Sequence, residues 1–185
     1  MARAMSDRST SMLWISLLTA ASTGTTLLLA CATPFPALAA LAAVHMRPRG
    51  GIALMLLAWA ASQAVGFGLL GYPHDPLTLG WGAALATAAA GSALAGYAVI
   101  ARLGTRPVAV QLATAYGAGF LAFKTVVAAW ALVLGGLHTA TAPSLLFEQF
   151  VRNGAILAGL YLLYRVLVAA GVPAPPRREA MPYRC

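Results

Sequence analysis

Charged side chains are scarce in this sequence. Only 9% of its 185 residues are charged and 61% are hydrophobic, and the mean hydropathy is +0.80. A soluble domain of this length needs a polar surface, which this composition cannot supply. We therefore expect the bilayer to be the main solvent of the chain. The few polar groups inside its apolar stretches then carry the evidence about function.

The motifs that enzymes and cofactor sites need are also missing. The sequence has no HExxH, GxSxG or Walker A pattern, and no pair of carboxylates within one apolar run. Its two cysteines, Cys31 and Cys185, are too scattered to form a metal motif. We expect neither catalysis nor a cofactor, and any use of ATP would require another chain.

Basic residues outnumber acidic ones, but their placement argues against nucleic acid as a partner. The chain has 12 Lys and Arg against 4 Asp and Glu, which gives a net charge of +8. The interleaving of aromatic and basic residues that single-strand binding needs is absent. The arginines lie instead at the ends of apolar runs, where they orient membrane helices.

Six apolar runs, separated by short loops, fill most of the chain. A helix that spans the hydrocarbon core needs roughly 20 apolar residues. The runs cover residues 12–32, 34–46, 51–71, 77–101, 108–136 and 145–171. We predict an all-α, polytopic membrane domain over residues 1–172 with about six transmembrane helices. A disordered cytoplasmic tail over residues 173–185 is expected to follow it.

The first two runs leave alternatives open. The first also fits a cleaved signal peptide or a lipoprotein site at Cys31. The second reaches only about 20 Å as a helix, so it is either a short packed helix or a re-entrant segment. We favour six crossings, because the two outer loops, 72–76 and 137–144, then contain no Lys or Arg. This topology places both termini in the cytoplasm and the chain in the inner (plasma) membrane.

Under this topology, five polar side chains fall in the middle or outer half of the membrane. They are Gln63, Lys124, Glu148, Arg152 and Asn153. A lysine at the bilayer centre costs about 2.5–3.5 kcal/mol, so Lys124 must face the bundle interior, a cavity or a carboxylate. Glu148 and Arg152 are four residues apart and can form an ion pair. The charges sum to one net positive, which favours an outward-open pocket for a small anionic or zwitterionic solute.

A structural role is the main alternative to solute binding. On that interpretation the chain is an assembly subunit of a larger membrane complex, and Lys124 pairs with Glu148 or with a partner. Small residues recur every four positions in the fourth run, at Ala88, Ser92 and Gly96. They indicate either a docking face for a partner membrane subunit or tight packing within the chain.

The loops on the outer side carry the only candidates for metal ligands. These are His74, Asp75 and His138. Histidine and aspartate can bind a divalent metal such as cobalt or nickel, but three scattered residues do not specify a site. A metal permease is therefore the lesser alternative.

In size and outline, the chain resembles the substrate-binding S components of energy-coupling-factor transporters. The likeness lies in six runs with both ends inside, a polar cluster near the outer face, and Ala20-x-x-x-Gly24 in the first run. That last pattern is close to the Ala-x-x-x-Ala pattern of the group. The resemblance implies docking on a shared membrane subunit that works with ATPase chains. The Met-x-His start of metal-specific members is absent, since residue 3 is Arg3.

Overall fold

The computed structural model describes residues 7–28 and 34–175. Within these two ranges, all regular secondary structure is helical. The helices are α1 (Asp7–Leu28), α2 (Phe35–His45), α3 (Pro48–Gly68), α4 (Pro76–Leu103), α5 (Val108–Leu134), α6 (Leu137–Ala140) and α7 (Pro143–Ala169). The alternative of a processing site at Cys31 and most of the predicted disordered tail lie outside the described residues.

Four helices, α3, α4, α5 and α7, are long and apolar enough to cross a membrane. The chain is therefore a helical membrane protein, as its composition predicts. Helix α2 has only 11 residues and rises about 16 Å, roughly half of the hydrocarbon core. The predicted outer loop 137–144 contains the short helix α6 and the start of α7.

Proline, aspartate and glycine mark the helix ends. A proline opens α3, α4 and α7, where its missing N–H would have had no partner within the helix. The carboxylate of Asp75 caps α4 by accepting hydrogen bonds from the backbone N–H groups of Leu77 and Thr78, both at 2.9 Å. Gly104 and Gly135 follow α4 and α5 with φ angles of 60° and 90°, which glycine adopts without strain.

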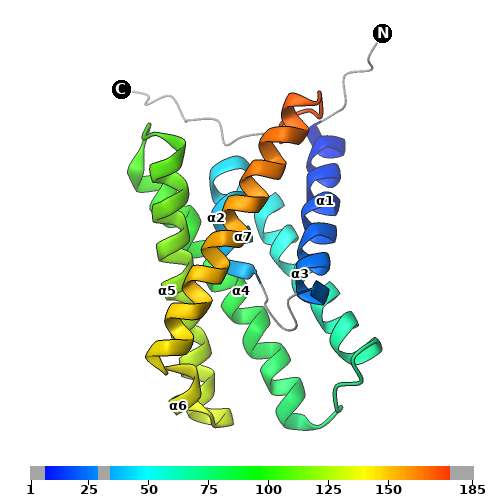
Figure 1. Cartoon of the computed structure of the whole chain (residues 1–185), viewed down its shortest axis with the longest axis vertical. Coiled ribbons are helices and arrows are strands. Elements are labelled where there is room, and N and C mark those ends of the chain that lie inside the picture. Colours follow the sequence, from blue (N-terminus) through cyan, green and yellow to red (C-terminus); the bar gives the residue numbers. More distant parts are fainter. Residues whose placement is uncertain (1–6, 29–33, 176–185) are drawn as a thin grey trace.

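Helix α2 forms the centre of the bundle (Figure 1). It packs against α3, α4, α5 and α7, and its apolar residues between Phe35 and Ala43 are at most 5% exposed. The hydroxyl of Tyr97 on α4 lies 3.1–3.3 Å from three carbonyl oxygens at the end of α2, those of Ala42, Met46 and Arg47. The short second run is thus a helix packed on all sides, which was one of its two predicted forms.

The small residues of α4 serve packing within the chain. Ala88 and Ser92 are 0% exposed, and Gly96 is buried. A Cβ atom at Gly96 would lie 3.3 Å from the Cβ of Ala43, so the small ridge allows α2 and α4 to approach closely. The chain's own helices therefore cover this ridge, and its small residues pack within the chain.

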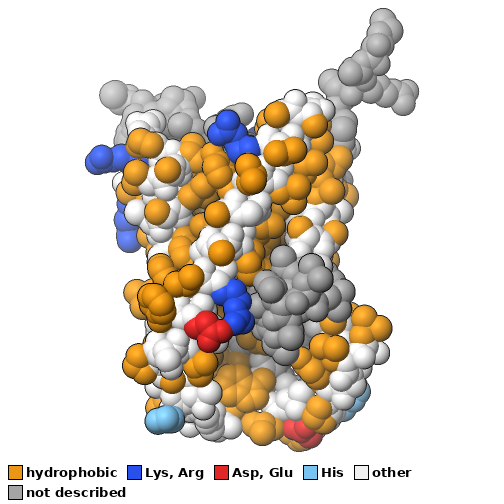
Figure 2. All heavy atoms as spheres, in the orientation of Figure 1, with side chains coloured by type: hydrophobic (Ala, Val, Ile, Leu, Met, Phe, Trp, Pro, Cys, Tyr) orange, Lys and Arg blue, Asp and Glu red, His pale blue; other side chains and the backbone are white. Residues whose placement is uncertain are grey.

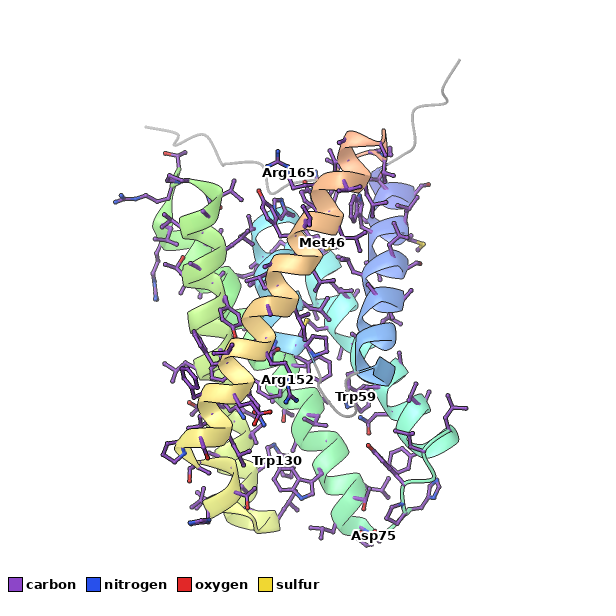
Figure 3. All side chains as sticks on the ribbon, viewed as in Figure 1. Met46, Trp59, Asp75, Trp130, Arg152 and Arg165 are labelled. Carbon is purple, nitrogen blue, oxygen red and sulfur yellow. The ribbon has the colours of Figure 1, made fainter. Side chains whose placement is uncertain are left out.

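The connections between helices gather at two opposite ends of the bundle. The start of α1, the α4–α5 connection and the end of α7 lie at one end, and the α3–α4 connection and α6 lie at the other (Figure 1). Figure 3 places Arg165 near the first end and Asp75 at the second. Most of the Lys and Arg side chains visible in Figure 2 lie toward the first end. Basic residues therefore favour one end, which agrees with the predicted alternation of the loops.

Candidate functional site

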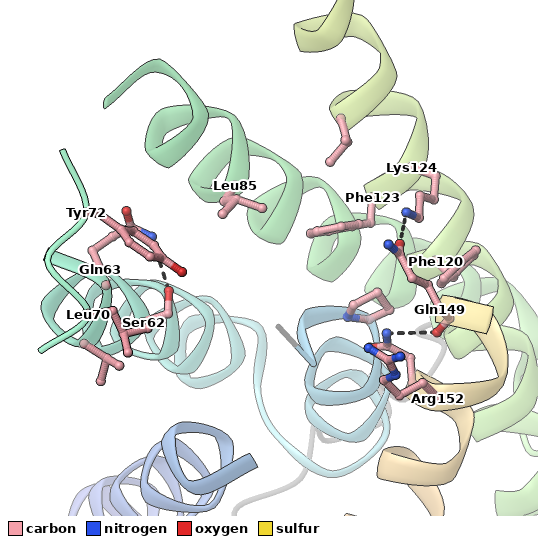
Figure 4. A pocket seen from close by; sticks show the side chains of 15 residues that line it. Ser62, Gln63, Leu70, Tyr72, Leu85, Phe120, Phe123, Lys124, Gln149 and Arg152 are labelled. Carbon is pink, nitrogen blue, oxygen red and sulfur yellow. Dashed lines mark hydrogen bonds between the residues drawn. The ribbon is translucent and has the colours of Figure 1, made fainter. Parts of the chain in front are cut away.

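A cavity of about 290 Å³ lies between α3 on one side and α5 and α7 on the other (Figure 4). This volume is near the lower end for small-molecule sites. Pro36, in the first turn of α2, contributes to the lining. The first turn of α2, and with it the positive end of the helix dipole, therefore lies at the cavity.

Lys124 of α5 lines this cavity and is partly buried. Its ammonium group donates a hydrogen bond to the side-chain oxygen of Gln149 on α7 and lies 5.8 Å from the centre of the Phe120 ring. Both partners are neutral. In the described ranges, no carboxylate pairs with Lys124, so the structure does not contain the Lys124–Glu148 pair that the structural interpretation proposed.

Asn153 of α7 lines the same cavity. The residue is only 7% exposed, and its amide nitrogen donates to the backbone oxygen of Gln149 at 3.0 Å. Because that partner can only accept, the amide nitrogen must face it and the amide oxygen must point elsewhere. That oxygen is buried and has no hydrogen-bond partner among the described residues. An unsatisfied buried acceptor costs about 1–3 kcal/mol.

Arg152 and Glu148 form the ion pair that their spacing predicts. Their side chains are 39% and 56% exposed, and an ion pair this exposed adds little stability. Only Arg152 lines the cavity; Figure 3 shows it partway along the bundle. Glu148 bonds the guanidinium group of Arg152 and is not among the described residues that line the cavity.

Uncharged polar groups of α3 form the opposite wall (Figure 4). The amide nitrogen of Gln63 donates to the hydroxyl of Ser62 at 3.3 Å, and that hydroxyl donates to the backbone oxygen of Trp59 at 2.7 Å. Tyr72 follows α3 and folds back over Gly66, where a Cβ atom would lie 2.7 Å from the tyrosine ring. The missing side chain at Gly66 thus allows Tyr72 to line the cavity.

The structure brings four of the five predicted residues into one lining. Gln63, Lys124, Arg152 and Asn153 line the cavity, and no aspartate or glutamate among the described residues does so. Gln149, which was not predicted as a site residue, links two of them: its side-chain oxygen bonds Lys124 and its backbone oxygen bonds Asn153. Its spacing of four residues from Asn153 was the available indication.

The three loop residues do not assemble into a metal site. His74 packs against Phe67 with ring centroids 5.0 Å apart, Asp75 caps α4, and His138 lies in α6. Across residues 7–28 and 34–175, no group of three His, Cys, Asp or Glu side chains could hold a metal ion.

A scan against protein-family models found no match, and neither did searches of curated proteins and of solved structures. The fold and the cavity define a helical membrane protein with an internal, positively charged cavity.

Proposed function

We propose that this chain is a membrane permease, or the solute-binding subunit of a transporter, that takes a small anionic or zwitterionic solute into the cavity. One observation supports this most: Lys124 and Arg152 line a space of about 290 Å³, and no acidic side chain in the described part of the chain lines it. A lysine inside a spanning helix is costly and in such proteins marks substrate or ion pathways. An anion bound beside Lys124 would offset its cost.

We infer that the end of the bundle nearest Arg165 is cytoplasmic and that the chain lies in the inner (plasma) membrane. Six membrane segments follow, with α1 leaving the cytoplasmic side and the short α2 returning to it. The placement of arginines and the absence of Lys and Arg from the loops 72–76 and 137–144 support this orientation. The cavity then lies in the outer half of the bilayer and opens outward.

Within the cavity, the residues take different roles. Lys124 and Arg152 hold the anionic group, and Glu148 keeps Arg152 oriented. Asn153 and Gln63 supply uncharged hydrogen-bonding groups, and apolar side chains contact the rest of the solute. Since the sequence contains no nucleotide-binding motif, ATP-driven uptake would require a partner membrane subunit and ATPase chains.

Native mass spectrometry of the protein, purified from its own host in mild detergent, tests this function. We expect a reproducible small-molecule adduct on the wild-type chain that Lys124→Met removes. Leu121→Met is the matched control, because Leu121 lies one turn earlier on α5 and is 69% exposed; this variant should keep the adduct. An adduct unaffected by Lys124→Met would contradict the site. A stable assembly with other subunits and no adduct would favour the structural subunit instead.

A further inference from the structure

We propose that Gln149 and Lys124 together bind a carboxylate group of the solute, and that Gln149 sets the preference of the site for a monocarboxylate. This inference rests on the proposed function. It adds a binding residue to the cavity and names the chemical class of the solute. It follows from the orientation of the Gln149 amide, from the balance of charge, and from the apolar part of the lining.

The contact with Lys124 fixes the orientation of the Gln149 amide. Because an ammonium group can only donate, the amide oxygen must face Lys124 and the amide nitrogen must point elsewhere. That nitrogen bonds none of the described residues. Nor is it enclosed, since the buried side-chain atoms that lack a partner in the described ranges do not include it. Gln149 lines the cavity, so we infer that its two N–H groups are available there to a solute.

Lys124 and Gln149 therefore present hydrogen-bond donors and no spare acceptor. Figure 4 shows the Gln149 side chain reaching from α7 to Lys124 on α5, so the ammonium group and the amide form one hydrogen-bonded unit. A carboxylate has two acceptor oxygens and no donor, and it can take one hydrogen bond from each of the two residues. A protonated amine would find no acceptor on either of them.

The balance of charge calls for a single negative charge. Lys124 has only neutral partners in the described part of the chain, whereas Arg152 already pairs with Glu148. A monoanion would neutralise Lys124, but a dianion would leave a second charge without a partner in a partly buried site. An ammonium group beside the carboxylate, as in an amino acid, would be repelled by Lys124. The carboxylate therefore has no amine next to it.

The apolar part of the lining fits a ring or a short branched chain. Phe120, Phe123, Leu85 and Val127 all border the cavity, and Figure 4 shows the two phenylalanines on the α5 side, near Lys124. A body placed there would remove apolar surface from water while its carboxylate reaches Lys124. The cavity is too small for a large conjugate, since about 300 Å³ is the lower limit of ordinary ligand sites.

Four compounds with one phenyl body test this class by calorimetric titration of the purified full-length protein. The first, 3-phenylpropanoate, is the monocarboxylate, and 3-phenylpropanamide lacks the charge. Phenylalanine adds an ammonium group on the neighbouring carbon, and benzylmalonate adds a second carboxylate there. We expect 3-phenylpropanoate to bind most tightly and each of the others to bind at least about tenfold more weakly, because each disturbs a hydrogen bond between charged groups.

The variant Gln149→Glu tests the role of the amide nitrogen. It keeps the oxygen that bonds Lys124, but it replaces the donor by an acceptor and adds the charge that balances Lys124. We expect the preference for 3-phenylpropanoate over 3-phenylpropanamide to fall to roughly twofold or less, and the adduct seen by native mass spectrometry to disappear. A purely structural role would weaken both compounds alike and leave the preference unchanged.

Gln111→Glu is the matched control, because it makes the same change of charge outside the cavity lining. The amide nitrogen of Gln111 donates to the backbone oxygen of Arg106 at 2.7 Å, in the first turn of α5. This variant should keep both the preference and the adduct. The comparison of the four compounds needs no variant, so it decides the question alone if Gln149→Glu does not fold.

Several results would overturn the inference and leave the proposed function standing. One is that any other compound binds as tightly as 3-phenylpropanoate. Another is that Gln149→Glu keeps the preference or the adduct. A third is that none of the four binds while the wild-type protein still carries an adduct. Binding of none of the four, together with the absence of an adduct, would reject both the inference and the proposed function.

Discussion

Replacing Lys124 by methionine separates a solute-binding role from a structural one. The ammonium group lies within α5, and its hydrogen-bond partner, the amide oxygen of Gln149, is neutral. The acid that could have balanced it, Glu148, bonds Arg152 instead. In the absence of solute, the charge of Lys124 therefore does not contribute to the stability of the fold.

The change in the free energy of unfolding caused by Lys124→Met follows from two opposing contributions. A lysine near the centre of a spanning helix costs about 2.5–3.5 kcal/mol, and a hydrogen bond from a charged group returns about 1.5–3 kcal/mol. Lys124→Met removes both. We therefore expect the free energy of unfolding to stay unchanged or to rise by up to roughly 2 kcal/mol. Removal of one partner of a buried structural ion pair would instead lower it by about 3–5 kcal/mol.

Reversible unfolding in mixed micelles, followed by circular dichroism, measures this difference. Leu121→Met on the same helix, with Leu121 69% exposed, controls for the effect of a new methionine. If the free energy of unfolding of Lys124→Met falls by more than about 2 kcal/mol and that of the control does not fall, the reasoning is refuted and a structural role for Lys124 is favoured.

Two further predictions concern the fold. Gly119→Ala would place a Cβ atom 2.9 Å from the hydroxyl and 3.3 Å from the carbonyl oxygen of Ser92. We therefore expect unfolding in micelles to show that this variant loses about 1–3 kcal/mol of stability. In the control Gly117→Ala, the new Cβ atom meets no atom within 4 Å, so that variant should be neutral or stabilising. Hydrogen bonds from the backbone and side chain of Thr78 hold the pKa of Asp75 below its ordinary value. The Asp75 carboxylate therefore stabilises the fold above its ordinary pKa and loses this contribution as the pH falls through the lowered value. The thermal unfolding temperature of Asp75→Ala should fall less steeply than that of the wild type as the pH is lowered. Equal slopes of unfolding temperature against pH in the two proteins would contradict the capping role of Asp75.

Much of the fold could be predicted, because a bilayer demands long apolar helices. The runs 77–101 and 108–136 correspond to α4 and α5 with shifts of at most two residues at their ends. The first apolar run was predicted over residues 12–32, whereas α1 covers Asp7–Leu28, since a helix can extend past its apolar run into polar surroundings. Helix α6 has four residues, too few for any periodicity. The central position of α2 depends on the other helices and has no sequence pattern.

The candidate site was predictable where a single residue is costly in hydrocarbon. Lys124, Arg152 and Asn153 stand out on that ground alone. Gln149 does not, because its importance comes from a contact with Lys124, 25 residues away on another helix. The partner of the ridge at Ser92 could not be assigned from the sequence for a related reason, since small residues pack equally well against the chain's own helices and against another subunit.

The claim that the cavity opens to the outside and receives a solute is tested most directly by a cysteine at Ser62, which lines it. In a chain carrying Cys31→Ala and Cys185→Ala, Ser62→Cys and the control Ala60→Cys differ in one respect: Ala60 is exposed on the outside of the bundle. A thiol reacts as the thiolate, which forms in water and not in lipid. We predict that a membrane-impermeant maleimide added to intact cells labels Ser62→Cys and leaves Ala60→Cys unlabelled. Labelling of Ser62→Cys only after the cells are permeabilised, or not at all, would contradict the account.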